Sequence, residues 1–126
     1  MTFDEIEKEI TSPLYPGKHH YDNVTRWTIT APMDQAIILK FKRFDLKEKN
    51  RKTQKCDKEY LKVYEGELGN SYSLAKTLCG SKIPNEFESK GNVLRLKFKA
   101  DYGSEKMGFQ ILFRNKGDKL VFILLI

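Results

Sequence analysis

Two adjacent histidines, His19 and His20, are the only ones in the chain and the first candidates for proton transfer. A catalytic histidine works with a nucleophile and with an acid that orients its ring. The sequence contains no nucleophile elbow and no local cysteine–histidine signature. We therefore expect no catalytic residues, and we interpret both histidines as exposed loop residues rather than zinc ligands.

The two cysteines, Cys56 and Cys79, could be free thiols of the core, a redox pair or a disulfide. Their spacing excludes a CxxC redox or zinc motif. Cys56 comes just before a predicted strand, and Cys79 lies in a Cys-Gly turn. A bridge that closes a loop is geometrically reasonable at such edges of elements. We therefore favour a disulfide over core thiols, and in the chain-entropy model it adds about 3 kcal/mol of stability.

Basic residues outnumber acidic ones, 23 against 17, which leaves a formal net charge of +6. This balance favours acidic partners, which include sulfated glycans, anionic lipid heads and acidic protein surfaces. No zinc spacing, recognition helix or RNP-like motif accompanies the charge, so we do not expect a nucleic-acid partner.

Five basic residues occupy alternate positions of two predicted strands, on the side away from the core: Lys40, Lys42, Arg95, Lys97 and Lys99. If the two strands are neighbours, these residues form one basic patch. A run of basic residues between strands would extend it: Lys47, Lys49, Arg51, Lys52 and Lys55. Sulfated glycan or acidic protein would suit such a patch. The alternative is a solvated sheet face beside a charged loop.

Alternation of apolar and polar residues with a period of two is the strongest local pattern of the chain. It predicts five strands, around residues 27–30, 37–42, 60–64, 93–100 and 109–114. Turn-forming segments separate them, and helical periodicity can be argued only for residues 3–10 and 73–78. At 126 residues the chain suits one domain with one core. We therefore predict an all-β sandwich of two antiparallel sheets.

The two ends of the chain and one sequon bear on localisation. Residues 1–10 lack the apolar segment of a signal peptide, so we expect any secretion signal to have been removed or to lie upstream. Residues 120–126 are intensely apolar but too short to span a bilayer. They could be an extra strand, the start of a membrane segment or a splice or cloning scar. Asn23 opens an Asn-Val-Thr acceptor, and we expect it to be glycosylated in the secretory pathway.

Several short motifs, in this order and spacing, resemble the CUB domain. This is an extracellular β-sandwich of complement proteases, tolloid-like proteinases, spermadhesins and growth factors. The resemblance runs from about residue 10 to residue 114, through residues 10–17, 27–29, 41–46, 56–66, 79–80, 91–94 and 98–101 leading to 108–109. It implies a jelly-roll sandwich in which Cys56–Cys79 is the second of two family bridges. The first is absent, because Thr25 stands at one of its cysteine positions; some family members also lack it.

Many CUB domains bind calcium through a Glu and two Asp residues from separate loops. The resemblance gives three candidate ligands here, Glu48, Glu59 and Asp101. Only Asp101 matches the pattern outright: Lys47 stands where the family has Glu, with Glu48 one residue late, and Glu59 replaces an Asp. A lysine beside the ion would oppose it electrostatically. Calcium therefore stays a candidate cofactor, and the alternative is that Glu59 and Asp101 pair with nearby lysines.

The resemblance implies a non-catalytic extracellular module that binds another protein. The module would belong to a larger secreted or cell-surface protein, and that parent could carry a protease domain. A stand-alone glycan-binding domain similar to the spermadhesins is the alternative. We expect three segments: an N-terminal extension (1–9), the CUB domain (10–115) and an apolar C-terminal tail (116–126).

Overall fold

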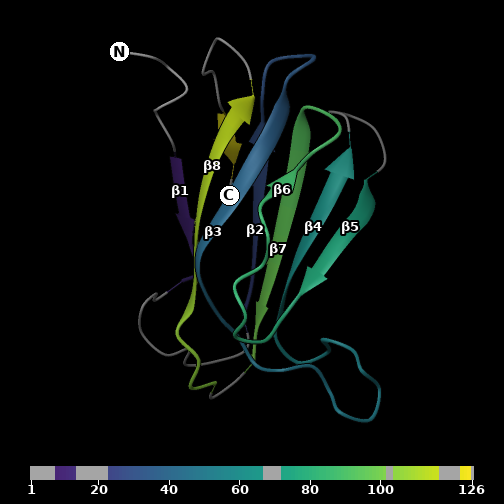
Figure 1. The fold of residues 1–126 in the computed structure, drawn as a ribbon, viewed down its shortest axis with the longest axis vertical. Coiled ribbons are helices and arrows are strands. Elements are labelled where there is room, and N and C mark those ends of the chain that lie inside the picture. Colours follow the sequence, from purple (N-terminus) through teal and green to yellow (C-terminus); the bar gives the residue numbers. More distant parts are fainter. Residues whose placement is uncertain (1–7, 14–22, 67–71, 102–103, 117–122, 126) are drawn as a thin grey trace.

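The computed structural model describes residues 8–13, 23–66, 72–101, 104–116 and 123–125, and it shows an all-β fold (Figure 1). The strands are β1 (Lys8–Thr11), β2 (Asn23–Thr30), β3 (Ala36–Asp45), β4 (Tyr60–Gly66), β5 (Ser73–Leu78), β6 (Phe87–Glu88), β7 (Val93–Ala100), β8 (Gly108–Lys116) and β9 (Ile123–Leu125). No helix occurs among these residues.

The strands form two antiparallel sheets that pack face to face. One has four strands in the order β1-β8-β3-β6, and the other has five in the order β5-β4-β7-β2-β9. Every strand pair is antiparallel. The predicted all-β sandwich of two antiparallel sheets is therefore confirmed.

An aromatic cluster joins the sheets at the centre of the core. Phe109 of β8 makes an edge-to-face contact with Phe98 of β7, with 5.1 Å between ring centroids, and another with Trp27 of β2 at 5.9 Å. Phe44 of β3 stacks on Phe109 from the same sheet at 6.4 Å. Such pairs are each worth about 0.5–1.5 kcal/mol beyond the area they bury. Trp27, Phe98 and Phe109 come from buried positions of the predicted alternation, whereas Phe44 lies beyond it and faces the core after a register shift between Phe41 and Arg43.

Two predictions about the periphery need correction. Residues 73–78, for which helical periodicity could be argued, form strand β5, and residues 8–10 of the first candidate helix belong to β1. β5 is an edge strand whose residues are exposed up to the half-buried Leu78, so its burial shows no alternation that would mark a strand. At the other edge, β9 pairs with β2, which confirms the extra-strand alternative for residues 123–125. The boundaries of the three expected segments stay a prediction.

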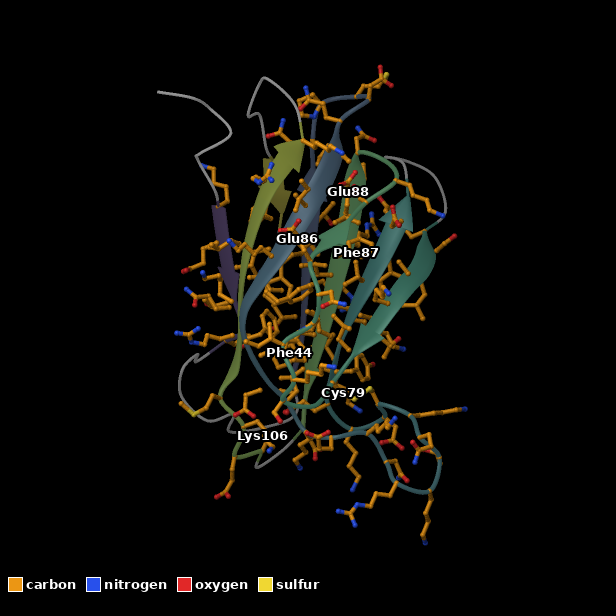
Figure 2. The ribbon with its side chains drawn as sticks, in the orientation of Figure 1. Phe44, Cys79, Glu86, Phe87, Glu88 and Lys106 are labelled. Carbon is orange, nitrogen blue, oxygen red and sulfur yellow. A yellow bond between two sulfur atoms is a disulfide. The ribbon has the colours of Figure 1, made fainter. Side chains whose placement is uncertain are left out.

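The loops that carry the acidic candidate calcium ligands lie at one end of the sandwich. Asp45 ends β3 and pairs with Gly108, the first residue of β8. Tyr60, the first residue of β4, pairs with Lys99 near the end of β7. The 46–59 loop and the segment after residue 100 therefore start at the same end, which we call the loop end. Figure 2 shows Cys79 and Lys106 at this end, below Phe44.

Candidate functional site

Glu59 is the buried anchor of the loop end, with a relative exposure of 1%. One carboxylate oxygen, Oε2, accepts hydrogen bonds from the backbone N–H of Lys47 at 2.9 Å and from the hydroxyl of Ser104 at 3.1 Å. The other, Oε1, accepts one from the backbone N–H of Asp101 at 3.1 Å. A buried carboxylate is tolerated only when donors replace its lost hydration. These donors come from two segments, the 46–59 loop and the connection between β7 and β8, so Glu59 holds the two together.

Lys47 and Asp101 form an ion pair beside this anchor. The ammonium Nζ of Lys47 lies 2.5 Å from Oδ2 of Asp101, and the two side chains are 33% and 25% exposed. The prediction that Asp101 pairs with a nearby lysine is therefore confirmed. Glu59 instead uses the backbone amide of the same lysine. Lys47 thus contacts both carboxylates through two different groups.

Glu48, the third calcium candidate, does not join them. Its carboxylate accepts hydrogen bonds from the backbone N–H and the hydroxyl of Ser81, at 3.2 and 3.3 Å. It also lies against Gly80, where an added Cβ would stand 2.9 Å from Oε1 of Glu48. Among the described residues, no group of three or more His, Cys, Asp or Glu side chains is placed to hold a metal ion. The three candidates do not converge, and the side chain at position 48 points to the 79–81 turn.

The disulfide between Cys56 and Cys79 is present, with sulfur atoms 2.00 Å and Cα atoms 5.9 Å apart. It joins the 46–59 loop to the turn that follows β5. Next to it, the backbone of Leu46 donates to the carbonyl of Gly80, and Gly80 donates to the carbonyl of Lys47, both at 2.9 Å. The predicted bridge is therefore confirmed, and it lies at the loop end with Glu48.

The predicted basic patch is divided between the two sheets. Lys40 and Lys42 lie on β3 of the four-stranded sheet, whereas Arg95, Lys97 and Lys99 lie on β7 of the five-stranded sheet. Side chains that point away from the core leave two packed sheets on opposite surfaces. The prediction of a single patch is therefore wrong, because alternation shows which side of a strand is buried but not which strand is its neighbour.

Two cations that the sequence analysis did not single out join the β7 residues on their face. Lys97 pairs in register with Arg26 of β2 on one side and with Lys62 of β4 on the other. We call Arg26, Lys62, Arg95, Lys97 and Lys99 the cationic face. None of the five forms a salt bridge in the part of the chain that the structure describes. The predicted alternation of residues 60–64 already placed Lys62 outside the core, whereas Arg26 lay before the predicted strand 27–30, which in the structure begins at Asn23.

Tyrosines surround these cations. Arg95 lies over the ring of Tyr72, with its Cζ 3.9 Å from the centroid, and Lys62 Nζ lies 4.7 Å from the centroid of Tyr60. Tyr64 pairs with Arg95 across β4 and β7. A shallow hollow follows this surface, lined by Arg26, Trp27, Thr28, Tyr64, Tyr72, Arg95, Leu96 and Lys97. The face therefore combines positive charge with flat aromatic surface.

A second hollow lies near the disulfide, between β5 and the segment that leads into β6. Its lining carries both signs of charge, with Lys49, Lys76 and Lys82 beside Glu48 and Glu86. Figure 2 labels Glu86 and Phe87, two neighbouring residues of this lining. Mixed charge of this kind favours no particular class of ligand.

The remaining candidates lie at the margins. Lys49, Arg51, Lys52 and Lys55 of the basic run are exposed on the 46–59 loop. Asn23 is the first residue of β2, and its glycosylation stays a prediction. His19 and His20 lie outside the described residues. No helix in the described part of the chain is long and apolar enough to cross a membrane.

The sequence model of the CUB domain matches residues 1–113. The chain belongs to the CUB domain family. Cubilin of Sus scrofa is 40% identical to this CUB domain over 87 residues, which are 69% of the chain and 2% of that protein. Tolloid-like protein 1 of Mus musculus is 34% identical over 101 residues, 80% of the chain and 10% of that protein. The chain thus corresponds to a small part of each relative.

A solved structure of the MASP-1 CUB2 domain bound to Ca2+ has the same fold as this CUB domain. The TM-score is 0.71 at 23% sequence identity, with 86% of this chain and 91% of that chain covered. The likeness supports the sandwich architecture, and the bound calcium is a property of that structure. In this CUB domain, Lys47 pairs with Asp101 and Glu48 bonds to Ser81 at the loop end.

Proposed function

We propose that this CUB domain is a non-catalytic extracellular interaction module that binds an acidic partner protein through its cationic face. The observation that carries the proposal is the row formed by Arg26, Lys97 and Lys62 on three adjacent strands. Like charges directly opposite one another destabilise a sheet. Carboxylates of a partner would relieve this repulsion, so binding would stabilise the face.

The composition of the face favours a protein as that partner. Tyrosine and arginine are enriched at protein interfaces and among the residues that dominate their binding energy. Here Tyr64 and Tyr72 line one hollow with Arg26 and Arg95, and the Tyr60 ring contacts Lys62 on the same face. Aromatic rings add contact area that does not depend on charge, which suits a folded acidic surface.

A sulfated glycan is the second candidate ligand, and the regular spacing of the cations favours it. Adjacent strands lie about 4.8 Å apart, so the row of Arg26, Lys97 and Lys62 presents three positive charges at even intervals. A linear polyanion could follow such a row. The formal net charge of +6 supports either ligand.

The setting of the module is part of the proposal. A disulfide between Cys56 and Cys79 suits an oxidising, extracellular environment. The chain covers 2% of cubilin and 10% of tolloid-like protein 1, so it would serve as one module of a larger secreted or cell-surface protein. Any protease activity would belong to another domain of that parent. Glycosylation at Asn23, on the first residue of β2, would be compatible with this setting.

Charge reversal on one sheet, compared with the same reversal on the other, tests the proposal. The variant Lys62→Glu/Lys97→Glu removes two members of the row, and Lys40→Glu/Lys42→Glu changes the net charge equally on the opposite sheet. Poly-glutamate and heparin serve as probes, by calorimetric titration at low salt and by elution from a heparin column in rising salt. We expect the first variant to bind poly-glutamate at least about tenfold more weakly than the wild type and the second to bind nearly normally.

The two probes separate the two ligands. Retention of the wild type on heparin near physiological salt, lost only in Lys62→Glu/Lys97→Glu, would favour the glycan. Elution below physiological salt would exclude it. Equal loss in both double variants, or no binding of either probe by the wild type, would overturn the assignment of the cationic face.

A further inference from the structure

We infer that the ammonium group of Lys47 takes the place of a metal ion at the loop end, so that these loops are ordered without calcium. The inference concerns the loop end alone and does not rest on the proposed binding face. It starts from the position of Lys47, which contacts two carboxylates. Glu59 lies just before β4, and Asp101 lies just after β7.

The first step is the way Lys47 links these segments. Its backbone N–H donates to Glu59 at 2.9 Å, and its side-chain ammonium reaches Asp101 at 2.5 Å. The backbone of Asp101 in turn donates to Glu59 at 3.1 Å. The three residues form a closed set of contacts that joins the end of β3, the start of β4 and the end of β7. A cation bound by separate loops would provide the same kind of link.

The second step is that too few carboxylates converge on this point to hold calcium. Calcium takes six to eight oxygen ligands at 2.3–2.6 Å, several of them carboxylates. Of the three candidates, only Glu59 and Asp101 meet at Lys47, because the Glu48 carboxylate turns away and bonds to Ser81. Asp45, another acid of this end, accepts the backbone N–H of Met107 at 3.0 Å. The donor set therefore does not fit a calcium ion.

The third step is electrostatic. An ion bound to Asp101 would lie within a few ångströms of the Lys47 ammonium, and two positive charges at that distance repel strongly in a partly buried site. Occupation by calcium would require the ammonium to leave. Two carboxylates and one ammonium carry one net negative charge. Three carboxylates and one Ca2+ carry the same net charge, so one lysine can replace one glutamate together with the ion.

Thermal melting in calcium and in EDTA tests this inference, and a single substitution should convert the site. We expect the wild type to melt at the same temperature in both buffers. Lys47→Glu places a third carboxylate beside Asp101 and Glu59. This variant should melt below the wild type in EDTA, and millimolar CaCl2 should raise its melting temperature, because a ligand that binds only the folded state stabilises it.

Two further variants keep the test decisive if Lys47→Glu folds poorly. Lys49→Glu makes the same charge change at an exposed position of the loop and should show no response to calcium. Lys47→Met keeps most of the side-chain stem but loses the ammonium, so it should melt lower and calcium should not restore it. A calcium-dependent rise in the melting of the wild type, or an unchanged melting temperature in Lys47→Met, would overturn the inference. A folded Lys47→Glu that ignores calcium would also contradict it. None of these measurements involves a binding partner, so failure here is distinct from failure of the proposed function.

Discussion

At the scale of single residues, Glu59 shows how this CUB domain keeps a carboxylate out of water. Its oxygens accept hydrogen bonds from Lys47, Asp101 and Ser104, and its exposure is 1%. All three donors come from segments that β-sheet pairing does not fix. The carboxylate therefore holds the loops together by hydrogen bonds, as cross-strand hydrogen bonds hold the strands. Its conservative replacement should be costly.

The substitution Glu59→Gln should destabilise the fold although it preserves size. A glutamine amide has one accepting oxygen and one donating NH2 group. Whichever way the amide turns, its NH2 group faces the N–H of Asp101 or the donors from Lys47 and Ser104. Leaving buried donors without an acceptor costs about 1–3 kcal/mol. We expect a loss of this size in the free energy of unfolding, measured by urea denaturation.

An exposed carboxylate provides the matched control for this experiment. Glu86 is exposed in the segment before β6. Glu86→Gln should change the unfolding free energy by less than about 0.5 kcal/mol, as is usual for surface substitutions. If both variants unfold at the same urea concentration, Glu59 does not organise the loop end.

At the scale of elements, the disulfide fastens the longest connection at the loop end to the edge of a sheet. The 46–59 loop contains no strand, and β5 is an exposed edge strand. Cys56 and Cys79 are separated by 23 positions, and the neighbouring backbone bonds between residues 46–47 and Gly80 depend on the same alignment. The bridge therefore stabilises both elements together.

The double variant Cys56→Ala/Cys79→Ala should lose about 3 kcal/mol of stability, because a loop of this length regains its freedom in the unfolded chain. Urea denaturation under oxidising conditions measures this loss. Adding a reducing agent should shift the wild type to the same midpoint and leave the double variant unchanged. A double variant as stable as the oxidised wild type would show that strand pairing alone holds the loop.

The strands with a clear inward face could be predicted from sequence, and the others could not. Trp27 and Ile29 on β2, or Leu96 and Phe98 on β7, alternate with polar residues because one face is buried. β5 lacks this signal since it is exposed on an edge, and β6 has only two residues. Edge strands are held by backbone pairing with a neighbour, which leaves little trace in the side-chain pattern.

The candidate sites, like the strands, could be predicted from the sequence only in part. The resemblance to the CUB domain placed Glu59 and Asp101 at one site, and the structure joins them through a hydrogen bond. The orientation of Glu48 could not be predicted from the sequence, since the path of the 46–59 loop turns its side chain toward Ser81. The cationic face was recognised only in part. Arg26 and Lys62 join it through strand order, which is a non-local property of the fold.

At the scale of the whole molecule, the five-stranded sheet is extended by a strand that lies beyond the residues matched by the CUB family. The CUB match ends at residue 113, whereas β9 lies at residues 123–125 and pairs with Thr28–Thr30 of β2. Without β9, that stretch of β2 would present unpaired backbone groups at an open edge. Open edges of this kind are templates for pairing with another molecule. We therefore expect β9 to protect this edge against pairing with another molecule.

The substitution Leu124→Pro tests this role, because proline removes a backbone donor and disrupts strand pairing. We expect a loss of about 1–2 kcal/mol in unfolding free energy, equivalent to one or two hydrogen bonds, and self-association that grows with protein concentration. Sedimentation velocity over a range of concentrations measures the second effect. Leu124→Val keeps the backbone N–H and should stay monomeric under the same conditions. If Leu124→Pro also stays monomeric and equally stable, the edge of β2 is closed without β9, and the pairing at Thr28–Thr30 contributes nothing to the solution behaviour of the molecule.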